Sequence, residues 1–497
     1  MTTYKNPILT GTYPDPSVCR VGDDYYLVNS SFCYFPGVPI FHSRDLIHWQ
    51  QIGHCLTRRS QLNLDNAPFW AGIFAPTLRY HDGRFYMITT NTTGGGNFFV
   101  WTDDPYGEWS DPIWLDQEGI DPSLTFDDDG RVYFTSTGIP SGIIQSEIDI
   151  KTGKILRKAE FIWHGMGGRY PEGPHLYHIG DYYYLMISEG GTEYAHRLTL
   201  ARSTSPWGPF EPCPHNPIFT HMNIPQNPLQ ATGHADLLQD HAGNWWIVCL
   251  AIRPSSGFPA HHLGRETILV PAGWDEDGWL VINDGKPAQL EMDVETTLPI
   301  RKSTCEILHD DFDDDTLAMC WNFIRTSQKD FWSLKARPSW LRLTGTGDTL
   351  DEVGAPAFVG RRQQYFESEI RVLMDYVPKQ AGDEAGLTLY QNDEHHYELY
   401  VMYEDNQRYV AVRQRIGSLI VVTTKAAIPD GEVTLIIRTT NLDYTFAYMQ
   451  QNTTHTLGSA RTRYLSSEVA GGFTGVYMGM YTYGDTPADF DWFEINL

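Results

Sequence analysis

Three carboxylates stand in similar proline-containing settings at distant points of the chain. Asp15 and Asp121 each precede a Pro-Ser pair, and Glu172 follows Pro171 and precedes Gly173-Pro174. Flanking prolines fix the backbone and interrupt a strand ladder, which suits a side chain held at the mouth of a strand. Hydrolysis of a glycosidic bond requires an acid on the leaving oxygen and a second carboxylate that acts on water or on the anomeric carbon. The alternative interpretation is that each Asp-Pro merely opens a turn.

The chain contains five loose repeats, and each of the three carboxylates lies near the start of one of them. Each repeat has a polar or acidic start, a short strand, a turn, an aromatic-rich strand and a surface strand. The starts are 45 to 62 residues apart and lie near Asp15, Pro76, Asp121, Glu172 and His234. Strand-built repeats of this length are typical of a β-propeller with one blade per repeat. Because innermost strands converge on the propeller axis, we expect these starts to meet in one funnel.

The strand pattern extends to the end of the chain and changes character near residue 296. Turn residues followed by aromatic and β-branched residues recur throughout, and sustained helical periodicity is almost absent. At 497 residues the chain exceeds one ordinary core. We therefore predict an all-β protein with a five-bladed β-propeller at 1–295, a linker at 296–308 and a β-sandwich at 309–497.

Composition narrows the class of ligand. A formal charge of −26 argues against nucleic acid and anionic membranes as partners, and no apolar run is long enough to span a bilayer. Aromatic residues make up 13% of the chain, which suits a protein that stacks rings on a neutral sugar. The seven cysteines show no pairing pattern and residues 1–6 do not resemble a signal peptide, so we expect a cytoplasmic protein.

Several motifs in the same order give the chain a resemblance to glycoside hydrolase family 43. It is most similar to the branch of β-xylosidases and α-L-arabinofuranosidases that carry an appended, concanavalin-like sandwich of jelly-roll type. The motifs are Tyr13-Pro14-Asp15-Pro16-Ser17, the stretch 31–40, Glu172-Gly173-Pro174-His175-Leu176-Tyr177, Ser188-Glu189-Gly190-Gly191-Thr192 and Leu263-Gly264-Arg265-Glu266-Thr267.

That resemblance implies an inverting glycosidase and a role for each carboxylate. Asp15 matches the general base and Glu172 the general acid. Asp121 matches a third carboxylate that orients the acid and adjusts its pKa, since a nearby negative charge disfavours ionisation of the acid. Inversion further implies that the two catalytic carboxyls stand about 6.5–9.5 Å apart, leaving room for water.

The resemblance also implies residues that hold the sugar. Arg265 matches an arginine of the terminal subsite, the alternative being a structural ion pair. His234 matches a histidine at the propeller axis that in some members binds a divalent cation such as Ca²⁺ through water, the alternative being a hydrogen-bonded core residue. We expect no cofactor to be required.

Aromatic residues are the expected walls of the pocket. Phe32, Phe74 and Trp70 are the candidates within the propeller repeats. Phe473, in the glycine-rich turn 471–475, resembles the residue of a loop that lids the site in relatives, and ordinary sandwich core is its alternative. Such a pocket would admit one terminal sugar of a neutral oligosaccharide, which makes the enzyme exo-acting. The sequence leaves a homo-oligomer open.

Four positions depart from the xylosidase pattern: Cys33, Phe74, Pro122 and Gly173, where xylosidase members tend to carry Glu, Trp, Ala and Ala. These departures favour α-L-arabinofuranosidase, with mainly β-xylosidase activity as the alternative.

Two other classes share parts of this pattern. Fructan and sucrose hydrolases also join a five-bladed propeller to a sandwich, but here no Asn precedes the Asp-Pro pair. A non-catalytic sugar-binding propeller would not need Asp121 and Glu172.

Overall fold

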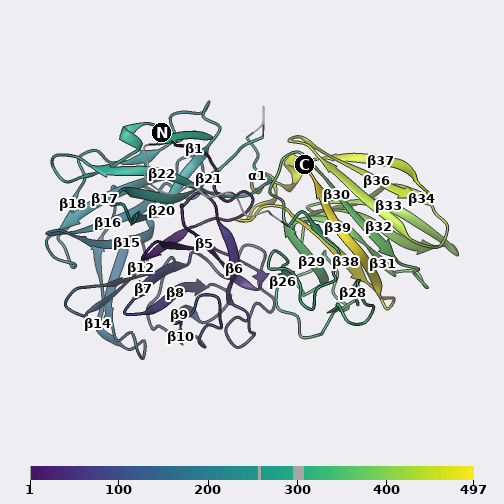
Figure 1. Cartoon of the computed structure of the whole chain (residues 1–497), viewed down its shortest axis with the longest axis horizontal. Coiled ribbons are helices and arrows are strands. Elements are labelled where there is room, and N and C mark those ends of the chain that lie inside the picture. Colours follow the sequence, from purple (N-terminus) through teal and green to yellow (C-terminus); the bar gives the residue numbers. More distant parts are fainter. Residues whose placement is uncertain (1, 256–258, 295–306) are drawn as a thin grey trace.

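The computed structural model describes residues 2–255, 259–294 and 307–497. It forms two β-domains that lie side by side, the propeller in purple to teal and the sandwich in green to yellow (Figure 1). Residues 295–306, which include most of the predicted linker 296–308, lie outside the described residues. The regular helix in the described ranges is α1 (Ser467–Ala470), accompanied by the 3₁₀ turns η1 (Asn283–Gly285) and η2 (Thr462–Leu465). Within those ranges the structure contains no helix with the length and apolarity needed to cross a membrane.

Five sheets radiate from one axis, as the repeats predict. The first blade is β2 (Ser17–Val21), β3 (Asp24–Val28), β5 (Gly37–Ser43) and β6 (Gln50–Leu56). The second is β7 (Thr77–His81), β8 (Arg84–Asn91), β9 (Gly96–Thr102) and β10 (Ile113–Trp114). The third is β11 (Ser123–Phe126), β12 (Val132–Thr137), β13 (Ile143–Ile148) and β14 (Ile155–Trp163). The fourth is β15 (Glu172–Ile179), β16 (Tyr182–Glu189), β17 (Arg197–Ser203) and β18 (Glu211–Pro212), with β19 (Phe219–Thr220) also on β17. The fifth is β20 (Gln230–Gln239), β21 (Trp245–Ile252), β22 (Glu266–Trp274) and β23 (Leu280–Ile282).

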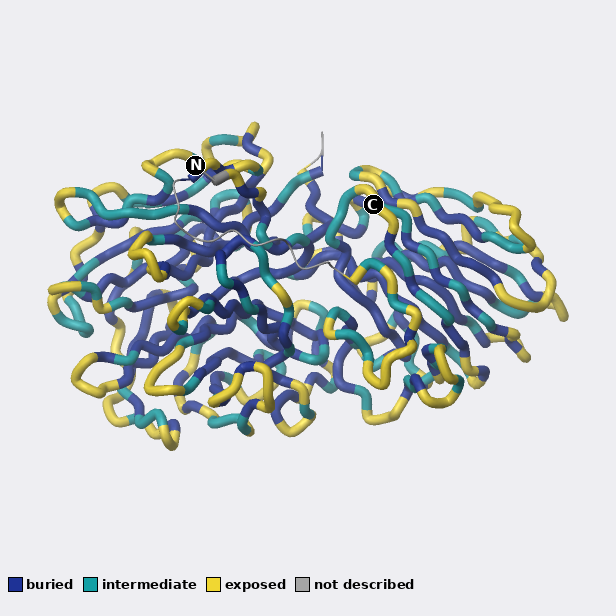
Figure 2. Tube along the Cα trace, viewed as in Figure 1, coloured by how far each residue is buried: buried dark blue, intermediate teal, exposed yellow. Residues whose placement is uncertain are grey.

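Short turns and a terminal strand pair hold the blades in order. Gly22, with φ of 62°, lies in the turn between β2 and β3, and such a left-handed conformation favours glycine. The N-terminal strand β1 (Thr2–Lys5) pairs antiparallel with β24 (Glu291–Val294), so the start of the propeller is joined to its end. Apolar faces of neighbouring blades pack into the buried cores that appear dark blue in Figure 2.

The sandwich consists of two antiparallel sheets. One contains β27 (Trp332–Ser333), β28 (Leu341–Leu343), β39 (Ala488–Asn496), β30 (Ser368–Asp375), β35 (Val433–Thr439), β36 (Asp443–Gln450) and β37 (Thr453–Arg461), with β25 (His309–Asp310) on β39. The other contains β29 (Ala357–Arg362), β38 (Tyr477–Tyr483), β31 (Glu384–Asn392), β32 (His395–Glu404), β33 (Gln407–Ile416) and β34 (Leu419–Ala427). Alternating apolar residues of both sheets form one core between them.

The two domains share a tight interface. Strand β4 (Tyr34–Phe35) of the first blade pairs with β26 (Phe323–Ile324) of the sandwich domain. Tyr34 stacks on Tyr477 with ring centroids 3.6 Å apart. The buried Arg362 donates from Nε to the carbonyl oxygen of Thr12 at 2.8 Å. Because these contacts flank the first blade, the sandwich is placed to reach the propeller funnel.

Candidate active site

The starts of the repeats do converge on one cavity. It contains about 390 Å³ of space free of protein atoms, part of it open to solvent. Its lining includes Asp15, Phe32, Phe74, Ala75, Ile120, Asp121, Glu172, Thr192, His234, Arg265 and Phe473. The predicted carboxylate trio is therefore brought together from three blades.

Several of the residues that line the cavity have left-handed backbone conformations. Asp15, Asp121 and His234 have φ of 52°, 54° and 48°. Non-glycine residues adopt this region rarely, and such strain is concentrated at functional sites. Asp15 and Asp121 lie just before β2 and β11, whereas Glu172 is the first residue of β15. His234 differs from the prediction because it lies inside β20, where the pairing with β21 shifts register.

Asp15 is held as an anion by its neighbours. Burial raises the pKa of this carboxyl, but the charges of Arg265 and His234 and the hydroxyl of Ser30 outweigh burial and lower it. Arg265 donates from Nη1 to Oδ1 at 2.8 Å and from Nη2 to Oδ2 at 3.3 Å. Ser30 donates to Oδ2 at 2.6 Å. An ionised carboxylate fixed in this way can accept a proton from water.

The electrostatic environment of Asp121 differs from that of Asp15. Burial, followed by the negative charges of Glu172 and Asp15, raises the pKa of Asp121 well above its usual range. Its Oδ2 accepts a 3.3 Å bond from the backbone N–H of Gly173. Asp121 is therefore favoured in its protonated form.

Arg265 combines both roles that the sequence left open. It forms the ion pair with Asp15 and also lines the cavity. Its Nη1 donates to Thr192 Oγ1 at 3.0 Å, and its Nε donates to the carbonyl oxygen of Phe473 at 3.3 Å. The guanidinium thus links the propeller carboxylate to a residue of the sandwich.

Three of the four predicted aromatic walls are in place. The rings of Phe32, Phe74 and Phe473 lie 5.5 to 6.0 Å apart, centroid to centroid. Trp70 is the exception because it is 49% exposed and is not part of the described cavity lining. It lies in a turn closed by the bond from Ala71 N–H to the Pro68 carbonyl.

The glycine-rich turn 471–475 packs against the propeller and places Phe473 in the cavity lining. A Cβ on Gly475 would lie 2.3 Å from the Leu263 carbonyl oxygen, and one on Gly472 would lie 2.9 Å from the Phe69 ring. The turn is also held from its own domain, because Gln391 donates to the Thr474 carbonyl at 2.9 Å. Phe473 is consequently a cavity residue and not sandwich core.

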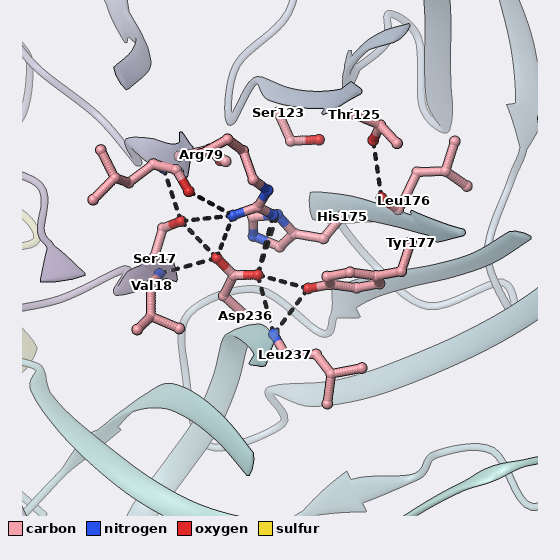
Figure 3. Close-up of polar contacts among 12 residues, drawn as sticks. Ser17, Val18, Arg79, Ser123, Thr125, His175, Leu176, Tyr177, Asp236 and Leu237 are labelled. Carbon is pink, nitrogen blue, oxygen red and sulfur yellow. Dashed lines mark hydrogen bonds and ion pairs between the residues drawn. The ribbon is translucent and has the colours of Figure 1, made fainter. Parts of the chain in front are cut away.

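The axis beneath the cavity does not fit a directly bound cation. Figure 3 shows the guanidinium of Arg79 beside Asp236, which is fully buried. Asp236 accepts from Arg79 at 2.7 Å, from Ser17 at 2.6 Å and from the Tyr177 hydroxyl at 2.7 Å. Burial would raise the pKa of Asp236, but Arg79 lowers it far below its usual range. In the described ranges no three His, Cys, Asp or Glu side chains form a group suited to a metal.

Sequence reasoning missed some residues of the site. Thr192 lies in a motif that carried the family resemblance, yet it received no role. His196, four positions further on, is fully buried with Nε2 3.3 Å from Glu172 Oε1. A lone histidine carries little signal, although its place just beyond the Gly190-Gly191-Thr192 motif could have marked it.

Comparison with known proteins agrees with this geometry. The model of glycosyl hydrolases family 43 matches residues 4–280, and that of the beta xylosidase C-terminal concanavalin A-like domain matches residues 309–496. A non-reducing end alpha-L-arabinofuranosidase of Bacteroides ovatus is 45% identical over 99% of this chain and 95% of its own. A xylosidase/arabinosidase of Butyrivibrio fibrisolvens is 40% identical over 100% of both chains. A beta-xylosidase of Bacillus subtilis is 35% identical over 98% of both.

Solved structures give the same result. A structure described as the Bacteroides ovatus xyloglucan PUL GH43B superposes with a TM-score of 0.97 over 100% of both chains at 45% identity. A xylan beta-1,4-xylosidase of Bacillus halodurans superposes with a TM-score of 0.93 at 36% identity over 99% of this chain and 100% of that one. From its matched domains, relatives and carboxylate-lined cavity, the chain belongs to glycoside hydrolase family 43 and is a glycosidase.

Proposed function

We propose that the protein is an exo-acting, inverting α-L-arabinofuranosidase that releases terminal non-reducing arabinofuranose from neutral oligosaccharides. The observation that carries the proposal is the meeting of Asp15, Asp121 and Glu172 around one small cavity whose wall includes the sandwich residue Phe473.

The three carboxyls have different environments, which suit them to different roles in hydrolysis. Asp15, kept ionised by Arg265, takes a proton from water as the water oxygen bonds to the anomeric carbon. Glu172, whose side chain is 17% exposed, gives its proton to the glycosidic oxygen as the bond from that oxygen to the anomeric carbon breaks. Asp121 orients Glu172 through the bond that it accepts from the backbone N–H of the next residue, Gly173. The net change is the addition of one water across the bond.

The shape of the cavity supports attack at chain ends. Phe32, Phe74 and Phe473 surround it, and the guanidinium of Arg265 lies 5.6 Å from the Phe32 ring centroid and 5.5 Å from that of Phe473. A guanidinium between apolar rings can bind sugar hydroxyls while the rings cover the sugar faces. An internal sugar of a polymer would need an opening on both sides.

The choice of arabinofuranose rests on two residues that depart from the xylosidase pattern. Phe74 lines the cavity directly. Gly173, with φ of 56°, lies against His234, and a Cβ there would be 3.0 Å from the His234 ring. Cys33 is buried and is absent from the described lining, so it bears on preference only indirectly. The arabinofuranosidase relative at 45% identity supports the same choice.

Comparison of kcat/KM on aryl α-L-arabinofuranoside and aryl β-D-xyloside tests the substrate. We expect the arabinofuranoside to be favoured, and a xyloside preference of about tenfold, roughly 1.4 kcal/mol, would reverse the assignment. Mainly β-xylosidase activity is the second candidate, since relatives at 40% and 35% identity carry xylosidase in their names. NMR of the first-formed product tests inversion.

We also propose that catalysis requires no divalent cation. The positive charge of Arg79 already compensates Asp236 at the axis, and His234 Nδ1 lies 3.8 Å from Asp15 Oδ1. Activity and melting temperature should both be unchanged by EDTA, and a fall in either would contradict this part of the proposal.

A further inference from the structure

His196 occupies a buried niche beside Glu172. Its ring is fully buried, with Nε2 3.3 Å from Glu172 Oε1 and Nδ1 3.2 Å from the carbonyl oxygen of Ala231. Nε2 has no aligned hydrogen bond to any described residue. Glu172 is therefore the group within reach of a buried nitrogen that would otherwise stay unsatisfied.

The surroundings of His196 determine which nitrogen carries the proton. A carbonyl oxygen only accepts, so Nδ1 must carry the hydrogen that bonds Ala231. Ala231 itself has φ of 54°, a left-handed conformation that turns this carbonyl toward the ring. In the neutral imidazole Nε2 is then bare and can only accept. The matching donor is a protonated carboxyl of Glu172.

From this geometry we propose that His196 is a positioning residue that holds the acid proton of Glu172 between turnovers. When the O–H of the Glu172 carboxyl points at His196 Nε2, the acid proton stays next to the reaction centre. Rotation about the Glu172 Cγ–Cδ bond then presents the same proton to the glycosidic oxygen. The inference rests on the proposed role of Glu172 as general acid.

Two glycines make room for the imidazoles on either side of the acid. A Cβ on Gly233 would lie 2.4 Å from the His196 ring, and one on Gly173 would lie 3.0 Å from the His234 ring. Burial lowers the pKa of His234, which therefore stays neutral around pH 7. The other titratable groups facing Glu172 are Asp121, whose pKa is raised, and Asp15 with its partner Arg265.

Two amide substitutions distinguish the role of His196 Nδ1 from that of Nε2. In His196→Asn the amide nitrogen can replace Nδ1 and keep the bond to Ala231, but nothing replaces Nε2. In His196→Gln the longer side chain can place its amide oxygen near the position of Nε2. The two variants are matched in polarity, and thermal unfolding checks that each is folded.

The test is leaving-group dependence together with the pH profile, measured on aryl α-L-arabinofuranosides. We expect His196→Asn to lose about tenfold or more in kcat on the phenyl glycoside but less than about threefold on the 2,4-dinitrophenyl glycoside, which needs little protonation. The alkaline limb of its kcat profile should move to lower pH, and His196→Gln should recover part of both effects.

Two results would overturn the inference. In the first, His196→Asn loses kcat equally on both glycosides and its pH profile is unchanged. In the second, His196→Asn retains activity and His196→Gln loses it. The second result would assign His196 to the Ala231 bond alone. Glu172→Ala is measured alongside. If that variant also fails to discriminate between leaving groups, the fault lies in the assignment of the acid itself.

Discussion

Gly264 and Gly475 meet backbone to backbone across the boundary between the two domains. A Cβ on Gly264 would lie 2.7 Å from the amide nitrogen of Gly475, and one on Gly475 would lie 2.6 Å from the amide nitrogen of Gly264. Gly264 directly precedes Arg265, and Gly475 closes the turn that carries Phe473. The sandwich therefore completes the active site at a point where neither backbone tolerates a side chain.

Gly475→Ala should separate this contact without unfolding either domain. Its new methyl group would overlap the Leu263 carbonyl oxygen at 2.3 Å, so the turn must move and Phe473 with it. We expect kcat/KM to fall by about tenfold to a hundredfold because a small displacement of a positioning residue is enough. The matched control is Gly458→Ala on β37, whose Cβ would meet nothing closer than 3.8 Å. Equal activity of the two variants would show that the position of this turn does not affect catalysis.

Arg265→Met should move the acidic limb of the pH profile. With the guanidinium present, the pKa of Asp15 is lowered, so the base stays ionised well into the acidic range. Without it, the largest cause that lowers the pKa of Asp15 is lost, so burial raises this pKa relative to the wild-type enzyme and the base becomes protonated at a higher pH. The limb should shift to higher pH, and Arg265→Lys should shift it less because it keeps the charge and loses the bidentate geometry. An unmoved limb would show that Arg265 does not control Asp15.

Glu172→Ala should lose activity according to the leaving group. A general acid contributes about 10² to 10⁴ in rate, chiefly where the departing oxygen is basic. We expect the phenyl arabinofuranoside to suffer that loss and the 2,4-dinitrophenyl compound to suffer much less. Asp15→Ala serves as the comparison, because a missing base should harm both substrates alike. Identical profiles for the two variants would contradict the division of roles.

Much of this architecture follows from patterns that are local in the sequence. Turn residues followed by aromatic and β-branched runs recur with each blade, so the five blades and the convergence of Asp15, Asp121 and Glu172 could be predicted. Phe473 was predicted only through a resemblance, since its contact with Arg265 joins residues far apart in the chain. Trp70 was misplaced because the sequence cannot show which way a loop ring turns.

Other features depend on backbone detail that composition does not encode. The placement of His234 within β20 comes from a register shift, and the niche of His196 comes from the left-handed backbone at Ala231. The axial pair of Arg79 and Asp236 joins two blades through side chains that look unremarkable in their own strands. Such pairings become visible only when the inner strands are brought together.

Arg79→Met tests that axial pair. It would leave Asp236 buried with its charge uncompensated, which typically costs about 3–5 kcal/mol. We expect urea unfolding to show a loss of this size and addition of Ca²⁺ to restore none of it. Combining Arg79→Met with Asp236→Asn should recover part of the stability, because the buried charge is gone. A loss below about 1 kcal/mol in the single variant would indicate that water reaches the axis.

The sandwich should lose stability as the pH rises, through one buried histidine. His396 is fully buried, with Nε2 3.1 Å from Glu398 Oε1 and 3.3 Å from Asp351 Oδ1. Burial alone would lower the pKa of His396, but these two carboxylates raise it to about 9. A group whose pKa is raised on folding stabilises the protein fully below its unfolded value of about 6.5. That contribution, about 3 kcal/mol, is lost as the pH rises through 9.

Unfolding by urea at pH 6 and at pH 10 should therefore show a drop of about 2–3 kcal/mol in the wild-type protein, and a much smaller drop in His396→Gln. The variant should already be less stable at pH 6, since Glu398 and Asp351 lose a positive partner and keep only Arg413 and Arg415, respectively, as basic partners among the described residues. His455→Gln, an exposed histidine on β37, is the matched control and should follow the wild-type curve. If the variant and the wild type lose the same stability between the two pH values, His396 is not charged in the folded protein.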